Sequence, residues 1–203
     1  MKLSLRLLFV LCVLPVSAVH AKDKSEKLVA KLSGFNEVHF IAGNATTPPA
    51  LRGAVSTAAS GQFTATIDKS ETQIAYTIVY KGLEADVTQS HIHFGQKHTV
   101  GGIVVWLCQT TGTPAPTAVA ASTPFCPGLR DGTVSGTITA AQVLTVTGQG
   151  IDATQFAELL RAIRAGAAYA NVHSTTFTPG EIRGQIKVSG KKDNNDDEDE
   201  DED

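Results

Sequence analysis

The chain has 203 residues, of which 42% are hydrophobic and 18% charged, and its formal net charge at pH 7 is −3. These values describe a globular chain that can bury a core. Its Lys and Arg residues do not gather into the basic face that nucleic-acid binding demands, so a nucleic-acid partner is not expected.

The first 21 residues, MKLSLRLLFVLCVLPVSAVHA, have the three-part pattern of a cleaved secretory signal. Two basic residues precede an apolar run over 7–16, and small residues then allow cleavage after Ala18 or Ala21. An uncleaved anchor needs about 20 apolar residues to cross a bilayer, and this run is too short. We therefore predict a periplasmic or secreted protein, with no membrane span once residues 1–21 are removed.

Alternating apolar residues mark the strands. In GQFTATI (61–67) and TQIAYTIVYKGL (72–83), apolar side chains alternate with more polar ones, and a turn signal follows each segment. Further strand-like segments are GGIVVWLC, GTVSGTITA, AAYANVHS and EIRGQIKV, at 101–108, 132–140, 167–174 and 181–188. This spacing predicts an all-β fold, an antiparallel Greek-key β-sandwich of the immunoglobulin or superoxide-dismutase-like type, in one domain over 30–189.

The segment SHIHFGQKH (90–98) holds three of the six histidines of the chain. Side chains of a strand alternate between its faces, so His91 and His93 point the same way, with their backbones roughly 6 to 7 Å apart. Two imidazoles at this spacing can ligate one copper or zinc ion. His98 follows a turn at Gly95, and it either returns as a further ligand or faces water.

Two cysteines, Cys108 and Cys126, remain once the signal and its Cys12 are removed. An even pair in an exported protein predicts a disulfide, which would stabilise the Thr-, Ala- and Pro-rich stretch between the two residues by roughly 3 kcal/mol. A thiolate metal ligand is the alternative, and it is less common in an oxidising compartment.

One segment, GIDATQFAELLRAIRAG, has the helical period instead. Its apolar side chains recur at i, i+3, i+4 and i+7, at Phe156, Leu159, Leu160 and Ile163. This pattern predicts one short helix over about 153–165. Asp152 and Gln155 resemble a capping box, and Gly166 suits the position after the helix end. We expect the apolar stripe to cover one end of the sandwich; a partner-binding helix is the alternative.

The last two strands carry polar residues. His173 is a candidate third ligand beside His91 and His93, because strands distant in sequence can be neighbours in a Greek-key sandwich. Glu181 and Arg183 are expected to be structural and can pair on one face of the final strand. The same histidines can instead belong to a hydrogen-bonded scaffold or a ligand pocket, and this alternative stays open.

Residues 191–203, KKDNNDDEDEDED, have no apolar side chain, which predicts a disordered acidic tail. The two ends hold four of the 17 basic and nine of the 20 acidic residues, so the body, with 13 and 11, is nearly neutral. The tail is expected to aid solubility or to bind cations or basic partners weakly, because it lacks the spaced ligands and the glycine of an EF-hand loop.

The order of several motifs resembles the CHRD domain, a family named from chordin and found, usually after a signal peptide, in many bacterial exported proteins. The motifs are LSGFNEV (32–38), SHIH (90–93), GGIVVWLC (101–108), GTITA (136–140) and NVHS followed by PGEIRGQI (171–186). Family members usually have prolines after N-E-V, where this chain has His39 and Phe40, and His98 is a second departure. The resemblance implies an extracytoplasmic β-sandwich and brings no biochemistry for the bacterial members.

The H-x-H spacing is also similar to that of two copper ligands in Cu/Zn superoxide dismutase. That enzyme uses four histidines on copper, separate zinc ligands and an arginine that guides superoxide. Five histidines remain after signal cleavage and cannot supply the two-metal set, which leaves copper alone. Arg183 would be the guide if it faced the same site.

We therefore expect a non-enzymatic binding or structural module with an extracytoplasmic ligand that the sequence does not identify. No catalytic residues are predicted, because the chain has no G-x-S-x-G elbow, phosphate loop or His-Glu-x-x-His motif. The alternative is a copper- or zinc-binding protein for metal handling or superoxide dismutase-like chemistry, with His91, His93, His173 and His98 as candidate ligands.

Overall fold

The computed structural model describes residues 25–41, 46, 48, 50–51 and 53–190. The predicted signal at 1–21 and the predicted acidic tail at 191–203 lie outside these residues. Among the described helices, none has the length and hydropathy that crossing a bilayer requires.

Strands make up most of the described regular structure. They are β1 (Glu26–Ser33), β2 (Phe40–Ile41), β3 (Ala50–Leu51), β4 (Ser60–Ile67), β5 (Ile74–Lys81), β6 (Val87–Phe94), β7 (Gly102–Cys108), β8 (Gly132–Ile138), β9 (Ala168–Ser174), β10 (Ile182–Gln185) and β11 (Lys187–Val188). The helices are α1 (Thr117–Ala120) and α2 (Phe156–Arg164), with 3₁₀ turns η1 (Gly34–Asn36) and η2 (Ala140–Gln142).

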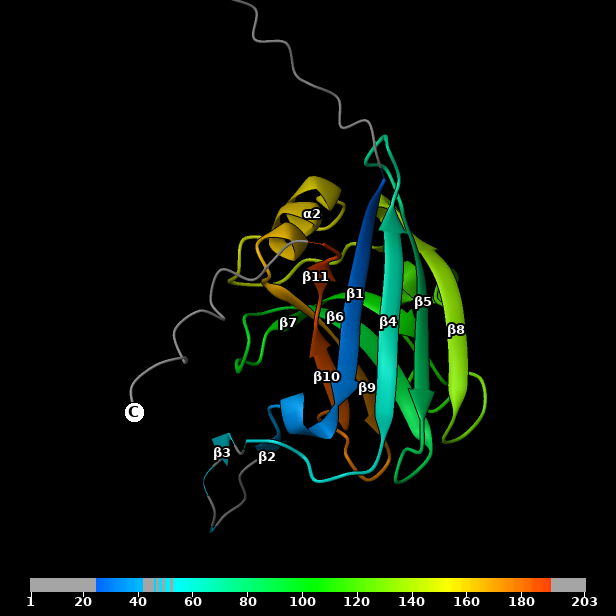
Figure 1. Cartoon of the computed structure of the whole chain (residues 1–203), viewed down its shortest axis with the longest axis vertical. Coiled ribbons are helices and arrows are strands. Elements are labelled where there is room, and N and C mark those ends of the chain that lie inside the picture. The colour runs from blue at the N-terminus through cyan, green and yellow to red at the C-terminus, as the bar shows by residue number, and fades with distance from the viewer. Residues whose placement is uncertain (1–24, 42–45, 47, 49, 52, 191–203) are drawn as a thin grey trace, which may run out of the picture.

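One antiparallel sheet contains most of these strands, in the order β7-β6-β9-β10-β1-β4-β5-β8, and β11 also pairs with β1. The strands β2 and β3 form a separate ribbon. In Figure 1, β1, β4, β5 and β8 run side by side while β6, β7 and β9 cross behind them, so the sheet curls over its own core. The predicted antiparallel all-β fold is confirmed, and its two layers belong to one continuous sheet.

The inward side chains of both layers form one hydrophobic core. Along β5, Ile74, Tyr76, Ile78 and Tyr80 are buried and alternate with more exposed neighbours, as the sequence pattern predicts. Burial of each large side chain contributes about 2 kcal/mol of hydrophobic stabilisation. The Tyr76 hydroxyl donates to the carbonyl oxygen of Leu107 at 2.7 Å, which joins β5 to β7 across the core.

The predicted helix is α2, and it presents its apolar stripe to the core near β1 and β11 (Figure 1). It begins at residue 156 and not at 153, because Thr154 has a φ of +69°, outside the helical range. The predicted capping box is half formed: Gln155 Oε1 accepts from the Asp152 N–H at 2.9 Å, but no side chain caps the first turn. Gly166, with a φ of +70°, ends the helix as expected.

Strand β9 is buried on both faces. Ala168, Ala170 and Val172 belong to the hydrophobic core, whereas the alternate residues face the other way and form a second, polar layer. We use the name polar layer for the buried side chains on this face of β6, β9 and β10: His91, His93, Tyr169, Asn171, His173 and Arg183. The loops 95–101 and 175–180 bond to this layer through their carbonyl groups.

Candidate metal centre

The sheet register brings three histidines to the polar layer. β6 is antiparallel to β9, with His91 opposite Asn171, His93 opposite Tyr169 and Gln89 opposite His173. Since residues two apart on a strand share a face, His91, His93 and His173 lie on the same side of the sheet. Their exposed fractions are 0%, 7% and 5%. A single outward face of two neighbouring strands therefore holds the whole group.

The three imidazoles converge. The ring centroids of His91 and His173 are 4.9 Å apart, and those of His91 and His93 are 5.4 Å apart. One ring nitrogen from each residue lies within 4.8 Å of the other two. With metal–nitrogen bonds of about 2.0 to 2.1 Å, three nitrogens spaced evenly around one ion lie about 3.6 Å apart, so the widest pair would close by up to about 1.2 Å. Small side-chain adjustments suffice for one ion to contact all three rings.

Backbone carbonyls fix the protons on two of these rings. Nδ1 of His93 lies 2.8 Å from the carbonyl oxygen of Gly101, and Nδ1 of His173 lies 2.8 Å from that of Thr178. A carbonyl oxygen accepts hydrogen bonds and cannot donate them, so each Nδ1 carries the proton and each Nε2 carries a lone pair. Histidines that ligate metals commonly hold their second ring nitrogen in this way.

Gly101 has a steric reason to be glycine. A Cβ atom at this position would overlap the carbonyl oxygen of Phe94, where the chain leaves β6 and returns in β7. The close approach of the two backbones allows the Gly101 carbonyl to reach His93. Any larger residue would displace this carbonyl and release the His93 ring.

The buried histidines have more lone pairs than donors. Nδ1 of His91 lies 3.2 Å from Nε2 of His173, and since that Nε2 carries a lone pair, His91 donates to it. Nε2 of His91 and Nε2 of His93 are buried and have no hydrogen-bond partner among the described residues. Buried polar atoms in folded proteins nearly always have a partner, so an electron-pair acceptor, either a hydrogen-bond donor or a metal ion, is expected at these two nitrogens.

Burial keeps all three imidazoles neutral. Desolvation lowers the pKa of His93 and of His173 to about 4, although the hydrogen bonds to Gly101 and Thr178 favour the charged forms. The pKa of His91 is held well below its ordinary value by burial, and then by repulsion from His173 and His93. Near neutral pH the electron-pair acceptor is therefore not a proton.

Aromatic rings and a cation enclose the histidines. The Trp106 ring lies 4.3 Å from His91, and the Tyr169 ring stacks on His93 at 4.7 Å with an interplanar angle of 3°. The guanidinium carbon of Arg183 lies 3.3 Å from the centroid of the Tyr169 ring, and Arg183 is only 2% exposed. This enclosure separates the imidazoles from bulk water.

Arg183 holds the loop 95–101 against the polar layer. Its guanidinium donates to the carbonyl oxygens of Thr99 at 2.7 Å and Gln96 at 3.0 Å. Gln185 adds a hydrogen bond to the carbonyl of Gly95 at 3.0 Å. An arginine committed in this way is not positioned to guide an anion to the histidines.

The side chains of Glu181 and Arg183 are both described, and they do not pair with each other as expected. Glu181 Oε1 instead accepts from the Thr57 hydroxyl at 2.9 Å and from the Glu84 N–H at 2.8 Å. Both residues are structural in this sense, but they tie different loops to the sheet.

His98 lies outside the cluster. It is exposed, and its φ of +64° belongs to a turn within the loop 95–101. Of the two alternatives for His98, the structure favours the one in which it faces water, because it does not join the other three histidines. The backbone turn directs the residue to solvent, where an imidazole is fully hydrated.

Sequence reasoning missed Glu37. This residue is 4% exposed, its Oε1 accepts from the Val38 N–H at 3.0 Å, and its Oε2 has no partner among the described residues. Burial raises the pKa of Glu37 to about 7, against the lowering influence of the Val38 N–H and of Arg183. In the sequence, Glu37 ends the motif segment LSGFNE directly after η1, and nothing in that position marks the glutamate as buried.

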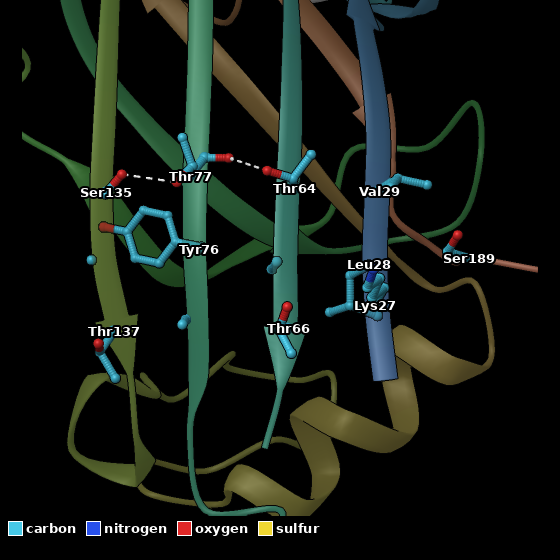
Figure 2. Close-up of a pocket in the computed structure, with 13 residues that line it drawn as sticks. Lys27, Leu28, Val29, Thr64, Thr66, Tyr76, Thr77, Ser135, Thr137 and Ser189 are labelled. Carbon is cyan, nitrogen blue, oxygen red and sulfur yellow. Dashed lines mark hydrogen bonds between the residues drawn. The ribbon is translucent and has the colours of Figure 1, made fainter. Parts of the chain in front are cut away.

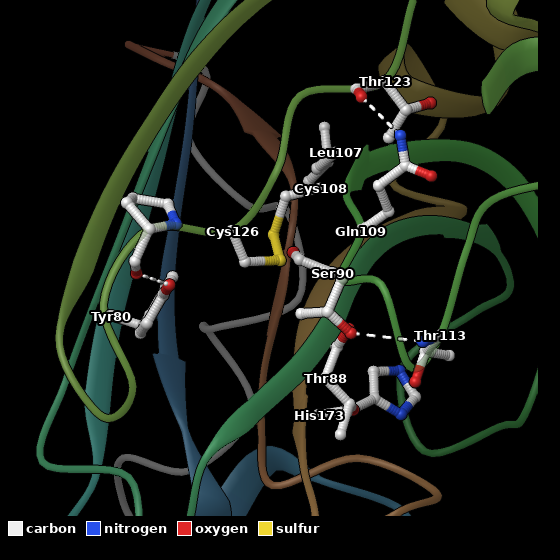
Figure 3. Close-up of a disulfide and its surroundings, with 12 residues drawn as sticks. Tyr80, Thr88, Ser90, Leu107, Cys108, Gln109, Thr113, Thr123, Cys126 and His173 are labelled. Carbon is white, nitrogen blue, oxygen red and sulfur yellow. Dashed lines mark hydrogen bonds between the residues drawn. A yellow bond between two sulfur atoms is a disulfide. The ribbon is translucent and has the colours of Figure 1, made fainter. Parts of the chain in front are cut away.

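Cys108 and Cys126 form a disulfide, in agreement with the sequence prediction. Figure 3 shows the bridge beside Gln109, whose amide reaches the carbonyl of Thr123 at 2.7 Å. The same amide nitrogen bonds the Ala120 carbonyl at 2.8 Å, at the end of the short helix α1. The thiolate-ligand alternative is excluded for these two residues, because both sulfurs are in the bridge.

A groove lies elsewhere, over the outer face of β1, β4, β5 and β8 (Figure 2). It encloses about 650 Å³ and is lined mainly by small hydroxyl and aliphatic side chains, including Thr64, Thr77 and Ser135. The Thr77 and Ser135 hydroxyls bond each other at 2.8 Å. The histidine cluster is not part of this groove, so the hollow surface and the metal-ligating chemistry occupy opposite layers.

Comparison with known proteins gives one family match. The family model described as CHRD domain matches residues 28–186, which include all three clustered histidines and every strand of the main sheet except β11 and the first two residues of β1. No curated protein and no solved structure matches the chain.

Proposed function

The chain belongs to the CHRD domain family, and on this premise we propose that it is an exported binding module whose ligand is a single copper or zinc ion. In this proposal a signal at 1–21 directs export, the domain at 30–189 binds the ion, and the tail at 191–203 remains solvated. The ligands are His91, His93 and His173.

One observation carries the proposal: the buried rings of His91, His93 and His173 converge, and Nε2 of His91 and Nε2 of His93 have no hydrogen-bond partner among the described residues. Imidazole nitrogens are common ligands of copper and zinc. In His93 and in His173, Nδ1 already bonds to a backbone carbonyl, which leaves Nε2 as the ligand atom. A bound ion would take the place of the hydrogen bond between Nδ1 of His91 and Nε2 of His173. A metal ion thus satisfies more of these nitrogens than any rearrangement of protons can.

The enclosure favours holding an ion over catalysis. The three histidines are nearly inaccessible, and Trp106 and Tyr169 pack against the rings of His91 and His93. Catalytic metal sites keep an open coordination position for water or substrate, which the burial of all three ligands disfavours. Binding or storage of the ion is therefore proposed ahead of superoxide chemistry.

The test is the metal content of the exported protein, purified without a metal-affinity tag. We expect copper or zinc at close to one ion per chain, and loss of this ion in His93→Ala and His173→Ala. His98→Ala is the matched control, because it removes an exposed imidazole from the adjoining loop, and it should retain the ion.

The competing possibility is a hydrogen-bonded scaffold in which a buried water donates to the free nitrogens. In that case the purified protein contains no metal and takes up neither ion at micromolar concentration, although circular dichroism shows it folded. That result would rule out the proposed function.

A further inference from the structure

The proposed ligand set has no negative charge. The described residues of the cluster are three histidines, which are neutral, and no carboxylate or thiolate belongs to the group. The charge of a bound ion is therefore not neutralised by its ligands. The cost of burying a charge rises with its square, so a divalent ion costs about four times as much as a monovalent one in the same enclosure.

A buried positive charge lies close to the cluster. The Arg183 guanidinium lies 3.3 Å from the Tyr169 ring, which stacks on His93 at 4.7 Å, so this cation is within about 8 Å of the His93 ring. Glu37 and Glu181 are buried carboxyls, but Glu37 contacts the Val38 N–H and interacts with Arg183, Glu181 bonds to Thr57 and Glu84, and neither belongs to the histidine cluster. The local field therefore adds to the penalty for a divalent ion.

The number of ligands also favours a monovalent ion over a divalent one. Structural zinc is almost always four-coordinate, and copper(II) prefers a tetragonal set of four or more ligands. Copper(I), with a filled d shell, accepts two or three nitrogen ligands without a water to complete its coordination. The cluster offers three nitrogens inside an aromatic enclosure, with His98 outside it.

From these three features, and resting on the proposed function, we infer that the site selects copper(I) over zinc and copper(II). The charge and the coordination number of the ion both discriminate, and the effect of charge can be tested without removing a ligand. Asn171 offers a direct way to test this: it lies opposite His91 in the sheet register, and its Oδ1 is buried without a partner among the described residues. Asn171→Asp would place a carboxylate beside the histidines at almost unchanged volume.

The experiment compares affinities by competition. Metal-free protein is titrated anaerobically with copper(I) against a chromophoric copper(I) chelator, and separately with zinc and copper(II) against indicators of those ions. We expect copper(I) to bind at least a thousand-fold more tightly than zinc. In Asn171→Asp the preference should shift toward zinc by tenfold or more, whereas Asn171→Ala, which adds no charge, should leave the ratio within a factor of three.

The outcomes separate the two claims. If zinc or copper(II) binds as tightly as copper(I), the selectivity inference is overturned while the proposed function stands. If no ion binds, the proposed function itself fails. If Asn171→Asp does not fold, the affinity ratio of the unmodified protein decides the matter alone.

Discussion

Acidification from pH 7.5 to 5 is expected to destabilise the metal-free protein, through the buried histidines. The pKa of His93 and of His173 is about 4 in the folded chain and about 6.5 in the unfolded chain, so the unfolded state binds more protons between these values. Stability present above pH 6.5 is therefore lost as the pH falls toward 4. At pH 5 each of the two residues has lost about 2 kcal/mol, and His91 adds to the loss.

Glu37 opposes this effect. Its pKa is raised by burial to about 7, so the folded state binds more protons than the unfolded state between pH 4.5 and 7. Acidification through this range stabilises the fold by about 2 kcal/mol, which offsets half of the loss from His93 and His173. Since the loss from His91 comes in addition, the unmodified protein should lose at least about 2 kcal/mol between pH 7.5 and 5, and Glu37→Gln at least about 4 kcal/mol. Arg183, the charged group that faces both Glu37 and His93, stays protonated throughout.

The assay is urea unfolding followed by circular dichroism at pH 7.5, 6.5, 5.5 and 5, in the presence of a chelator. Asp152→Asn is the matched control, because it makes the same carboxyl-to-amide change at an exposed position and should follow the unmodified protein. Parallel pH profiles for Glu37→Gln and the unmodified protein, or greater stability of both at pH 5 than at 7.5, would refute this reasoning.

Three further predictions concern stability. Replacing Cys108 and Cys126 together by alanine should lower the free energy of unfolding by about 3 kcal/mol, since the bridge closes a loop with a sequence separation of 18; unchanged urea midpoints would contradict this. Leu159→Ala, at a fully buried position of α2, should cost about 3 kcal/mol, while the exposed Arg161→Ala should change the thermal midpoint little. Arg183→Met removes two hydrogen bonds that hold the loop 95–101. Trypsin should therefore cleave after the exposed Lys97 several-fold faster than in the unmodified protein. Equal cleavage rates would show that other contacts hold the loop.

The strands and the helix could be predicted because their signals are local. Alternation in β5 and the stripe of α2 depend on residues within one element, and both match the structure. The start of α2 differed by three residues, because the positive φ of Thr154 is a property of the turn and not of the apolar pattern. The order of the strands in the sheet depends on pairings between distant segments, which periodicity does not specify.

In the candidate site, too, the local spacing of residues could be predicted, whereas contacts between distant segments could not. The i, i+2 spacing indicated that His91 and His93 share a face, and the proximity of His173 was a hypothesis that the β6–β9 register supports. The exposure of His98 depends on one backbone turn. Glu37 became buried through contacts between loops, so its position in the sequence gave no measure of its environment.

The most direct test of the central claim is nitrogen NMR of the histidine rings, on protein with ¹⁵N-labelled histidine, before and after one equivalent of copper(I), which is diamagnetic. The metal-free spectrum should show His93 and His173 protonated at Nδ1. Copper(I) should shift one ring nitrogen of each of His91, His93 and His173 together, and leave His39 and His98 unchanged. Shifts at His98 alone, or no shift in the three clustered residues at saturating copper(I), would contradict the account.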